Sequence, residues 1–395
     1  MACLNFGKVN KKFLIPIIGG IVRLIYSFLI QLNSKFQIAL KNPFILSIYT
    51  NIGMIFAFIP YLILKYRSKM PNPNSNELQH KSKLNLELIV HSDSIEEIKS
   101  NKYKLIALSS IFDFSQTIIG FLFCMRVVYN LWIFDIIFIS LFSHLILKTK
   151  IYRHQYFSMI IILCLGLALN VIEYFKLEEP EKSLSPFEIS MKFLTEISLS
   201  LNIVIIKYNM EKNYCSPYEI CIWEGIVGVI LQIIGLVIVN ILRLTIDGIQ
   251  YPDNFFEYFE NYNIDDFILC ILVIIVDFIY NASIMVTCDY FTPFHILITS
   301  IIKEFYYYIK INENIILNII GIFALILISF MFLVFVEIIE LNACNISYNT
   351  KKNIERRSQI ESSYNKRHFR DSNEEIRVDE DNLVNSTVSS ISDNY

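Results

Sequence analysis

Long apolar runs alternate with short polar segments along most of this chain. A helix that crosses a bilayer needs about 20 mostly apolar residues, and runs of this length recur between residues 13 and 340. The pattern predicts an all-α integral membrane protein with ten transmembrane helices. Their expected ranges are 13–31, 44–64, 104–125, 127–147, 155–175, 187–207, 217–242, 266–288, 292–310 and 314–340.

The polar segments of the chain mark the edges of this membrane part. The run 13–31 carries Arg23 near its middle and no small-residue cleavage site, so we expect a retained helix rather than a signal peptide. A polar cytosolic loop is expected at 65–103, and a second polar segment covers 243–265. Residues 343–395 are rich in Ser, Asn, Arg and Glu, a composition that predicts a disordered cytosolic tail.

The distribution of lysine and arginine predicts the orientation, because cytosolic segments carry an excess of both. Eight of these residues lie in 65–104 and eight more in the tail, whereas 243–265 has only Arg243 among several acids. We therefore expect both termini in the cytosol and segment 243–265 on the outer or lumenal side.

Short sequences recur at corresponding places in the two halves of the chain. Asn-Pro-Phe around Pro43 begins one apolar run, and Ser-Pro-Tyr around Pro217 begins another in the second half. The stretch Ile-Phe-Asp-Phe around Asp113 reappears as Ile-Val-Asp-Phe around Asp277, at nearly the same offset along the chain. These matches indicate a duplicated unit of five helices.

The odd number of helices in the unit has a consequence for topology. The second unit enters the membrane from the opposite side, so the two units are inverted repeats. We expect an N-terminal repeat at 1–175 and a C-terminal repeat at 176–342. Inverted repeats leave a binding site near the bilayer midplane where they meet, which is the layout of a secondary transporter.

Composition narrows the class of protein further. Hydrophobic residues make up 54% of the chain and charged residues 18%, against roughly 25% charged in soluble domains. The net charge of −3 indicates no nucleic-acid partner. The eight cysteines include no C-x-x-C pair, so neither a disulfide framework nor a metal site is expected. The chain lacks the P-loop, hydrolase, metalloprotease and kinase motifs, and we expect no enzymatic activity and no cofactor.

Two short stretches suggest a family. They are Ser216-Pro217-Tyr218-Glu219 and Tyr290-Phe291-Thr292-Pro293-Phe294. With the ten-helix architecture, they resemble the drug/metabolite transporter superfamily, and within it orphan members of solute carrier family 35, the nucleotide-sugar-transporter-like group. The resemblance implies an endomembrane location, such as Golgi or vacuole. It also implies that Lys303 faces substrate phosphates, although the adjacent Glu304 departs from the family pattern.

Polar residues inside the apolar runs are the candidates for the site, because an ionisable group at mid-bilayer costs at least ~2.5–3.5 kcal/mol and usually faces the bundle interior. Several recur at three- and four-residue steps, which places them on one helix face. Glu224 is followed by Gly225 and Gly228, which permit close helix approach. The candidate substrate-binding residues are Lys303, His295, Thr299, Tyr306, Asp113, Gln116, Thr117, Asp277, Asn281, Asp135 and Glu224.

Each of these residues also has a structural interpretation. The buried acids could pair with neighbours without binding a ligand, and Lys192 with Glu196 is expected to form a local ion pair near the outer interface. Glu173 and Glu337 follow the two repeated aspartates at equal spacing and are expected to mark helix ends. His144 and His154 are expected at the surface.

Three functions remain open from the sequence. The pattern favours a secondary transporter of a small polar organic solute, such as a nucleotide sugar or another organic anion, in the lipid bilayer. The alternatives are a cation, amine or drug exporter of the same superfamily, because acids outnumber bases in the apolar runs, and a non-transporting scaffold or receptor. The sequence is compatible with a monomer or a homodimer.

Overall fold

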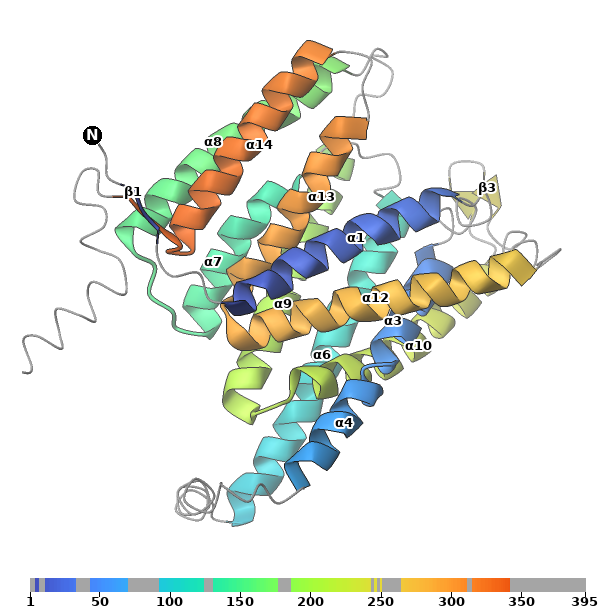
Figure 1. The fold of residues 1–395 in the computed structure, drawn as a ribbon. Coiled ribbons are helices and arrows are strands. Elements are labelled where there is room, and N and C mark those ends of the chain that lie inside the picture. Colours follow the sequence, from blue (N-terminus) through green and yellow to red (C-terminus); the bar gives the residue numbers. More distant parts are fainter. Residues whose placement is uncertain are drawn as a thin grey trace, which may run out of the picture.

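The chain folds into a bundle of long helices, seen in a computed structural model (Figure 1). The structure describes residues 4–6, 11–32, 43–69, 92–123, 131–176, 186–242, 245–246, 249–250, 264–310 and 315–341. The expected tail 343–395 lies outside the described residues.

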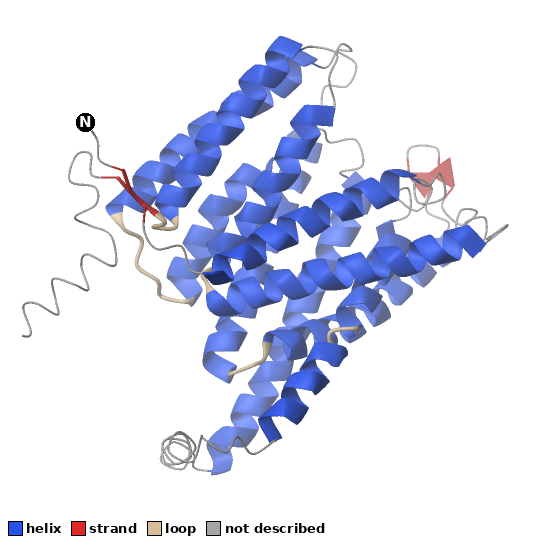
Figure 2. Ribbon diagram, viewed as in Figure 1, coloured by secondary structure: helices blue, strands red, loops and turns tan. Residues whose placement is uncertain are grey.

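Helices account for nearly all of the described chain (Figure 2), as the apolar runs predicted. The α-helices are α1 (Leu14–Leu32), α3 (Pro43–Ile55), α4 (Phe58–Lys69), α6 (Ser92–Phe123), α7 (Asp135–Ile146), α8 (Arg153–Lys176), α9 (Pro186–Asn213), α10 (Pro217–Leu242), α12 (Ile264–Tyr290), α13 (Leu297–Lys310) and α14 (Ile315–Phe335). Short 3₁₀ helices are η1 (Lys11–Phe13), η2 (Leu131–Phe134) and η4 (Pro293–Ile296), and the strands are β1 (Leu4–Phe6), β2 (Thr245–Ile246), β3 (Ile249–Gln250) and β4 (Ile339–Leu341).

Six described segments are long and apolar enough to cross a membrane. They are Phe44–Tyr66, Arg153–Val171, Ile189–Asn213, Pro217–Ile238, Ile264–Tyr290 and Asn318–Phe335. Two shorter apolar helices, Leu14–Leu29 and Leu131–Ile146, cover two more of the expected ranges. The expected spans 104–125 and 292–310 are helical in α6 and α13. These two helices are not among the six segments above, because α6 carries polar residues and α13 has only 14 residues.

The outer faces of several helices carry large apolar side chains with no covering element. On α12 the exposed residues are Ile264, Phe267, Ile268, Ile271, Leu272, Ile275 and Ile279. Soluble monomers seldom expose so continuous an apolar stripe, whereas lipid tails solvate it. The described helices therefore have the character of an integral membrane protein.

One expected helix is broken and one expected loop is shorter. The run 44–64 forms two helices, because Pro60 has no N–H to donate and its ring clashes with the carbonyl one turn earlier. At the break, the Phe56 amide donates a hydrogen bond to the Gly53 carbonyl, three residues earlier, at 3.0 Å. The polar loop expected at 65–103 is partly wrong, because α4 continues to Lys69 and α6 begins at Ser92.

Helices from the two halves of the chain pack against one another throughout the bundle. The extensive contacts join α6 to α9, α3 to α10, α1 to α12, α8 to α14, α1 to α13, α3 to α12, α7 to α9 and α6 to α10. Glycine permits the closest of these. A Cβ added at Gly225 would lie 2.6 Å from the Asn51 carbonyl oxygen, and one at Gly228 would meet the Asn51 side chain. The predicted close approach at these glycines is confirmed.

The two ends of the described chain meet on one side of the bundle. Strand β1 pairs with β4 in antiparallel register, with Leu4 opposite Leu341 and Phe6 opposite Ile339. The β2–β3 hairpin lies far from this pair, beyond the other end of the helices (Figure 1).

Candidate functional site

The first polar group in the bundle interior surrounds Glu224. The Ser109 hydroxyl of α6 lies against two acceptors, the Glu224 carboxylate of α10 and the Asn202 side-chain oxygen of α9, and can donate its one proton to either. Asp113 lies one turn along α6 from Ser109. We name Ser109, Asp113, Asn202 and Glu224 the Glu224 cluster; it joins α6, α9 and α10.

A second polar group surrounds Asp277. The Thr50 hydroxyl of α3 donates to Asp277 Oδ2 of α12 at 3.0 Å, and Tyr26 of α1 hydrogen bonds to Thr50. Asn281 donates to the backbone carbonyl of Asp277 at 3.0 Å and so is bound to its own helix. Tyr26, Thr50 and Asp277 form the Asp277 cluster, which joins α1, α3 and α12.

The two clusters occupy corresponding places in the two halves of the sequence. Glu224 follows Thr50 at the same offset that separates Pro217 from Pro43, and Asp277 follows Asp113 at the offset of the similar Ile-Phe-Asp-Phe and Ile-Val-Asp-Phe sequences. The offsets are thus those of the repeated short sequences in the same helices. A polar contact forms at both places, between Ser109 and Glu224 in one and between Thr50 and Asp277 in the other.

A third group brings charges of both signs together from α1, α7, α9 and α13. Lys303 lies within electrostatic range of Arg23, Lys192, Glu196 and its neighbour Glu304. Buried Asp135 accepts a hydrogen bond from Ser200 at 3.2 Å and is also hydrogen bonded to Glu196. We name the central charged cluster by its members Arg23, Asp135, Lys192, Glu196, Lys303 and Glu304.

The Lys192–Glu196 ion pair was predicted and is confirmed, with the two atoms 2.9 Å apart. Its place differs from the expectation of a local pair near the interface. The Glu196 side chain is buried and reaches Asp135 on α7. Sequence spacing along α9 identified the pair but not the partner on another helix.

Polar residues continue from the Glu224 cluster along the α3–α6–α10 junction. The Gln232 amide of α10 donates to the Thr117 hydroxyl at 3.1 Å, and Thr117 lies 3.2 Å from the Ser47 hydroxyl of α3. Thr117 also donates to the Asp113 carbonyl. The Gln116 amide nitrogen is buried without a hydrogen-bond partner.

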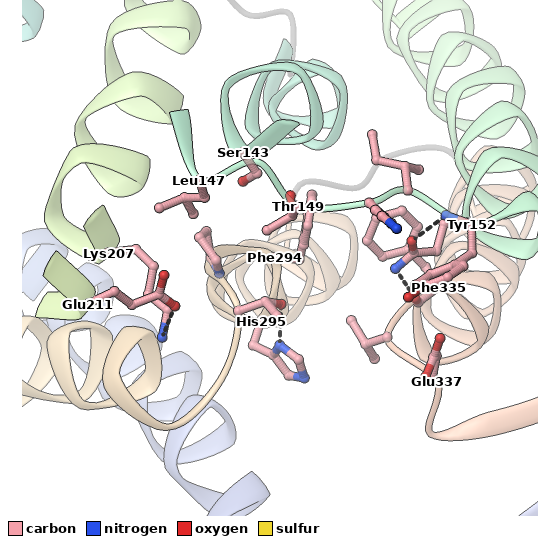
Figure 3. A pocket seen from close by; sticks show the side chains of 16 residues that line it. Ser143, Leu147, Thr149, Tyr152, Lys207, Glu211, Phe294, His295, Phe335 and Glu337 are labelled. Atoms are coloured by element: carbon pink, nitrogen blue, oxygen red, sulfur yellow. Dashed lines mark hydrogen bonds and ion pairs between the residues drawn. The ribbon is translucent and has the colours of Figure 1, made fainter. Parts of the chain in front are cut away.

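A cavity of about 320 Å³ opens at the end of the bundle where α7, α9 and α14 finish (Figure 3). Its wall includes His295, which is buried, hydrogen bonds to Thr292 at 3.0 Å and stacks on Phe291. Lys207 lies on the same wall, donates to the Cys288 carbonyl at 2.7 Å and pairs with Glu211 at 3.3 Å.

The sequence missed most of this cavity wall. The sequence pattern singled out none of Lys207, Tyr152, Gln155 and Glu211 as candidate residues. Gln155 also lines the cavity, where it accepts a hydrogen bond from the Tyr152 amide and donates one to the Phe335 carbonyl. These residues lie at helix ends that only the tertiary fold brings together, so no periodicity could have marked them.

The expectation of a surface His154 is wrong. Its side chain is 1% exposed, and its Nε2 lies 3.2 Å from Glu337 Oε1 at the end of α14. His144 is exposed, as expected, and contacts the Thr149 carbonyl. Glu337 lies at a helix end, as expected, with φ of 61°; the side chain of Glu173 lies outside the described residues.

The candidate residues therefore fall in several places rather than on one stripe. His295 lies in the cavity at the bundle end, whereas Lys303 belongs to the central charged cluster. Thr299 between them is buried, donates to the Ile296 carbonyl and packs against Gly19. Tyr306 is partly buried on α13.

An ion pair and a buried thiol lie near the start of α10, outside the membrane-spanning segments. Glu219 pairs with Lys102 of α6 at 2.5 Å. Burial opposes the charge of Lys102, but its hydrogen bond to Glu219 prevails and raises its pKa. Burial raises the pKa of the neighbouring Cys215 thiol to about 11, with Lys102 opposing the rise.

Within the described ranges no group of three or more His, Cys, Asp or Glu side chains could hold a metal ion. No family model matches the chain, and no curated protein resembles it significantly in sequence. Geometry and sequence pattern are thus the basis for a functional assignment.

Proposed function

We propose that this protein is a secondary transporter of a small polar organic solute, built from two inverted five-helix repeats. The N-terminal repeat would contain α1, α3 with α4, α6, α7 and α8. The C-terminal repeat would contain α9, α10, α12, α13 and α14. The architecture resembles that of the drug/metabolite transporter superfamily.

The pattern of helix contacts supports the repeat. Exchanging each helix for its counterpart turns the α6–α9 contact into α12–α1, α7–α9 into α13–α1, and α3–α12 into α10–α6, and all of these contacts are extensive. The α3–α10 and α8–α14 contacts map onto themselves, as expected for helices beside a two-fold axis. The exchange is approximate, because neither the α13–α14 contact nor the α9–α12 contact has a counterpart of similar extent.

The central charged cluster is the observation that carries the proposed function. Its members lie on α1, α7, α9 and α13, and the proposed exchange pairs α1 with α9 and α7 with α13. Charged groups inside a membrane bundle are costly and are rarely kept where packing alone is needed. Here cations and acids from both repeats converge, as a site between two rocking units requires.

The cations of this cluster favour an anionic solute. In the proposed mechanism Lys303, with Arg23 and Lys192 nearby, binds the anionic part of the solute. Asp135 and Glu196 accept from its hydroxyl or amine groups. The cavity lined by His295 and Lys207 forms a vestibule at one end of the path. Rocking of one repeat against the other then exposes the cluster to each side in turn.

The acids of the same cluster keep the amine or drug exporter as a second candidate. Glu304 is buried and lies directly beside Lys303. If Glu304 neutralises Lys303, the remaining acids favour a cationic solute. The β1–β4 pair supports placing both ends of the described chain on one side, which the charge distribution suggests is cytosolic. The endomembrane location rests on the family resemblance alone.

A ligand screen on the purified protein tests the proposal. Nucleotide sugars, nucleotides, organic acids and amines are added singly, and the unfolding temperature is measured. A ligand at 100 times its Kd adds about 2.7 kcal/mol, which shifts the midpoint by several degrees. The expected hit is an organic anion whose effect is lost in Lys303→Ala and kept in Lys104→Ala, an exposed lysine control.

Other outcomes contradict the proposal in distinguishable ways. Stabilisation by amines that survives Lys303→Ala and fails in Glu304→Gln would favour the exporter. Stabilisation by none of the four classes, with no flux of any of them in liposomes, would favour the scaffold.

A further inference from the structure

We infer that the N-terminal strand is a latch, which holds the cavity end of the bundle closed and opens it when the strand is released. The N-terminal latch is the pairing of β1 (Leu4–Phe6) with β4 (Ile339–Leu341). The role of the latch rests on the proposed function and deepens it, because it names a control of access to the vestibule. The opening of the cavity itself does not require transport.

The first support is the place of the latch at the cavity. Strand β4 begins two residues after Glu337, and Phe335, Val336 and Glu337 belong to the cavity wall. Figure 1 shows β1 and β4 beside the ends of α8 and α14. In the proposed repeats β1 belongs to the N-terminal unit and β4 to the C-terminal unit. The latch therefore joins the two units at the rim of the cavity.

The second support is the backbone conformation at the end of α14. The Ile338 amide donates to the Leu333 carbonyl at 2.9 Å, and the Glu337 amide donates to the Val334 carbonyl at 3.1 Å, which is a Schellman motif. Glu337 has a φ of 61°, a left-handed conformation in which glycine is usual. A glutamate kept in this conformation depends on contacts around it.

The first turn of α8 supplies two of these contacts. His154 Nε2 lies 3.2 Å from Glu337 Oε1, and the Gln155 side chain donates to the Phe335 carbonyl at 3.3 Å. Helix α8 belongs to the proposed N-terminal unit, as β1 does. The segment 335–341 of the C-terminal unit is thus held by α8 at its beginning and by β1 at its end.

Of these two attachments, β1 is the one that opens at low cost. It is a three-residue strand paired with another three-residue strand, and an isolated two-stranded pair is only marginally stable in water. The helices of the bundle bury far more apolar surface. Local opening of the strand pair therefore precedes any loss of the helical fold.

A second anchor keeps the released strand nearby. Lys12 of η1 lies over the Tyr290 ring, with its Nζ 3.6 Å from the ring centroid. The Phe13 ring contacts those of Phe291 and His295 edge to face, at 6.2 and 6.1 Å between centroids. Four residues separate β1 from η1 in the sequence, which span at most about 14 Å. Re-pairing with β4 is therefore an intramolecular step at high effective concentration.

The two states of the latch differ at the cavity wall. With β1 paired, the end of α14 stays against the first turn of α8. With β1 released, this end is held by the α8 contacts alone and moves outward more readily, which widens the cavity. Entry of solute from the expected cytosolic side then depends on the N-terminal strand.

The labelling rate of a cysteine on the cavity wall tests the latch in the reconstituted full-length protein. Ser143 is 0% exposed, lines the cavity, and its Oγ has no hydrogen-bond partner within the described residues, so Ser143→Cys breaks no bond described there. Its reaction with maleimide is measured by mass spectrometry. Cys270, a buried thiol on α12 that does not line the cavity, reports loosening of the whole bundle in the same sample.

A double proline variant, Asn5→Pro with Phe6→Pro, releases the strand. Successive amides of a strand point to opposite sides, so one of the two faces β4, and proline has no amide hydrogen. Asn5→Ala with Phe6→Ala is the matched control, because it keeps both amides. Size-exclusion elution and unfolding temperature establish that each variant is folded.

A disulfide between Asn5→Cys and Glu340→Cys locks the strand. These residues are opposite each other in the pair, and opposite Cα atoms lie about 4.5–5.5 Å apart, within the range of a disulfide. Cys3 and Cys344 are replaced by serine in this variant, so that neither exchanges with the new bond.

We expect the proline variant to raise the labelling rate of Ser143→Cys about 10-fold, as the loss of one or two ladder hydrogen bonds would. The alanine control should change the rate far less. Oxidation of the locked variant should lower the rate below that of the unlocked protein, and reduction should restore it. Labelling of Cys270 should stay the same throughout.

An unchanged rate in the proline variant would overturn the latch, and so would an equal rise in the alanine control or at Cys270. Counterflow with a solute from the ligand screen separates the latch from transport. Loss of the overshoot on oxidation, with recovery on reduction, is the expected result. An overshoot that survives oxidation would overturn the latch and leave the transporter intact. Labelling that follows the latch without flux of any solute would support the latch and contradict the transporter.

Discussion

At the scale of single residues, Asp113 and Asp277 show what a sequence repeat does and does not reveal. The repeat identified both and placed both inside the bundle. It did not reveal that Asp277 accepts a hydrogen bond from the Thr50 hydroxyl on another helix. Partners on other helices follow from packing, which periodicity along one helix does not encode.

The Lys102–Glu219 pair gives the first prediction. Replacing Lys102 by Met should lower the free energy of unfolding by about 1 kcal/mol at neutral pH, the upper range for partly exposed ion pairs. The pKa of Lys102 is raised by folding, so its contribution is present below the ordinary value of 10.5 and is lost as the pH rises through the higher folded value.

Thermal unfolding followed by tryptophan fluorescence from neutral to strongly alkaline pH provides the measurement. The Met variant should lose less stability above pH 10.5 than the wild type. Lys104→Met, an exposed neighbour, serves as the control and should match the wild type. Equal stability of both variants at neutral pH would contradict the role of the pair.

Cys215 gives the second prediction. A thiol with a pKa of about 11 instead of 9.0 holds about 100-fold less thiolate at neutral pH, and the thiolate is the form that reacts. Cys215 is also buried. Maleimide labelling followed by mass spectrometry should therefore find Cys215 unmodified while an exposed cysteine placed nearby by Lys212→Cys reacts fully. Equal rates at the two sites would show that the loop is open.

At the scale of helices, hydropathy predicted the elements well and their ends poorly. A helix forms in each of the ten expected runs, but the helix in the run 314–340 ends at Phe335 and the run closes in turn and strand residues. The break at Pro60 and the extension of α6 back to Ser92 were not predicted. A proline near the end of an apolar run is compatible with a spanning helix, and a polar segment is compatible with a helix outside the membrane, so hydropathy alone does not distinguish these cases.

Close helix contacts give the third prediction. A Cβ at Gly53 would lie 2.8 Å from the Ile274 carbonyl oxygen, and one at Gly225 would lie 2.6 Å from that of Asn51. Both atoms belong to backbone and yield only if the helices separate. Gly53→Ala and Gly225→Ala should each destabilise the bundle by about 1–3 kcal/mol.

Gly20→Ala is the matched control, because the nearest atom there, at 2.5 Å, is the terminal carbon of the flexible Ile302 side chain. The unfolding temperature in detergent measures all three variants. The unfolding temperature of the Gly20→Ala control should fall clearly less than that of the other two variants. An equal fall in Gly20→Ala would show that the contacts of α3 are not especially close.

At the scale of the whole molecule, the inverted repeat is the central structural idea. The sequence suggested it from short matches and an odd helix count. Helix contacts that exchange between the two halves also favour this proposed repeat. The cavity at the bundle end could not be predicted, since its wall comes from segments far apart in the chain.

Sidedness gives the fourth prediction. Lys212 at the end of α9 and Asp265 at the start of α12 are both exposed and lie at opposite ends of α10 and α12. A membrane-impermeant maleimide should label Lys212→Cys only from the cytosolic side and Asp265→Cys only from the other, in sealed vesicles with the wild type as background. Labelling of both from one side would contradict the helix count and the inverted repeats.

Counterflow in liposomes is the most direct test of transport. Vesicles containing the protein are loaded with an unlabelled hit from the ligand screen, and a trace of labelled compound is added outside. A carrier with alternating access accumulates the label transiently above its equilibrium level, and Lys303→Ala abolishes this overshoot while Lys104→Ala keeps it. Label that never exceeds equilibrium, or an overshoot unchanged in Lys303→Ala, would contradict a carrier site at the central charged cluster.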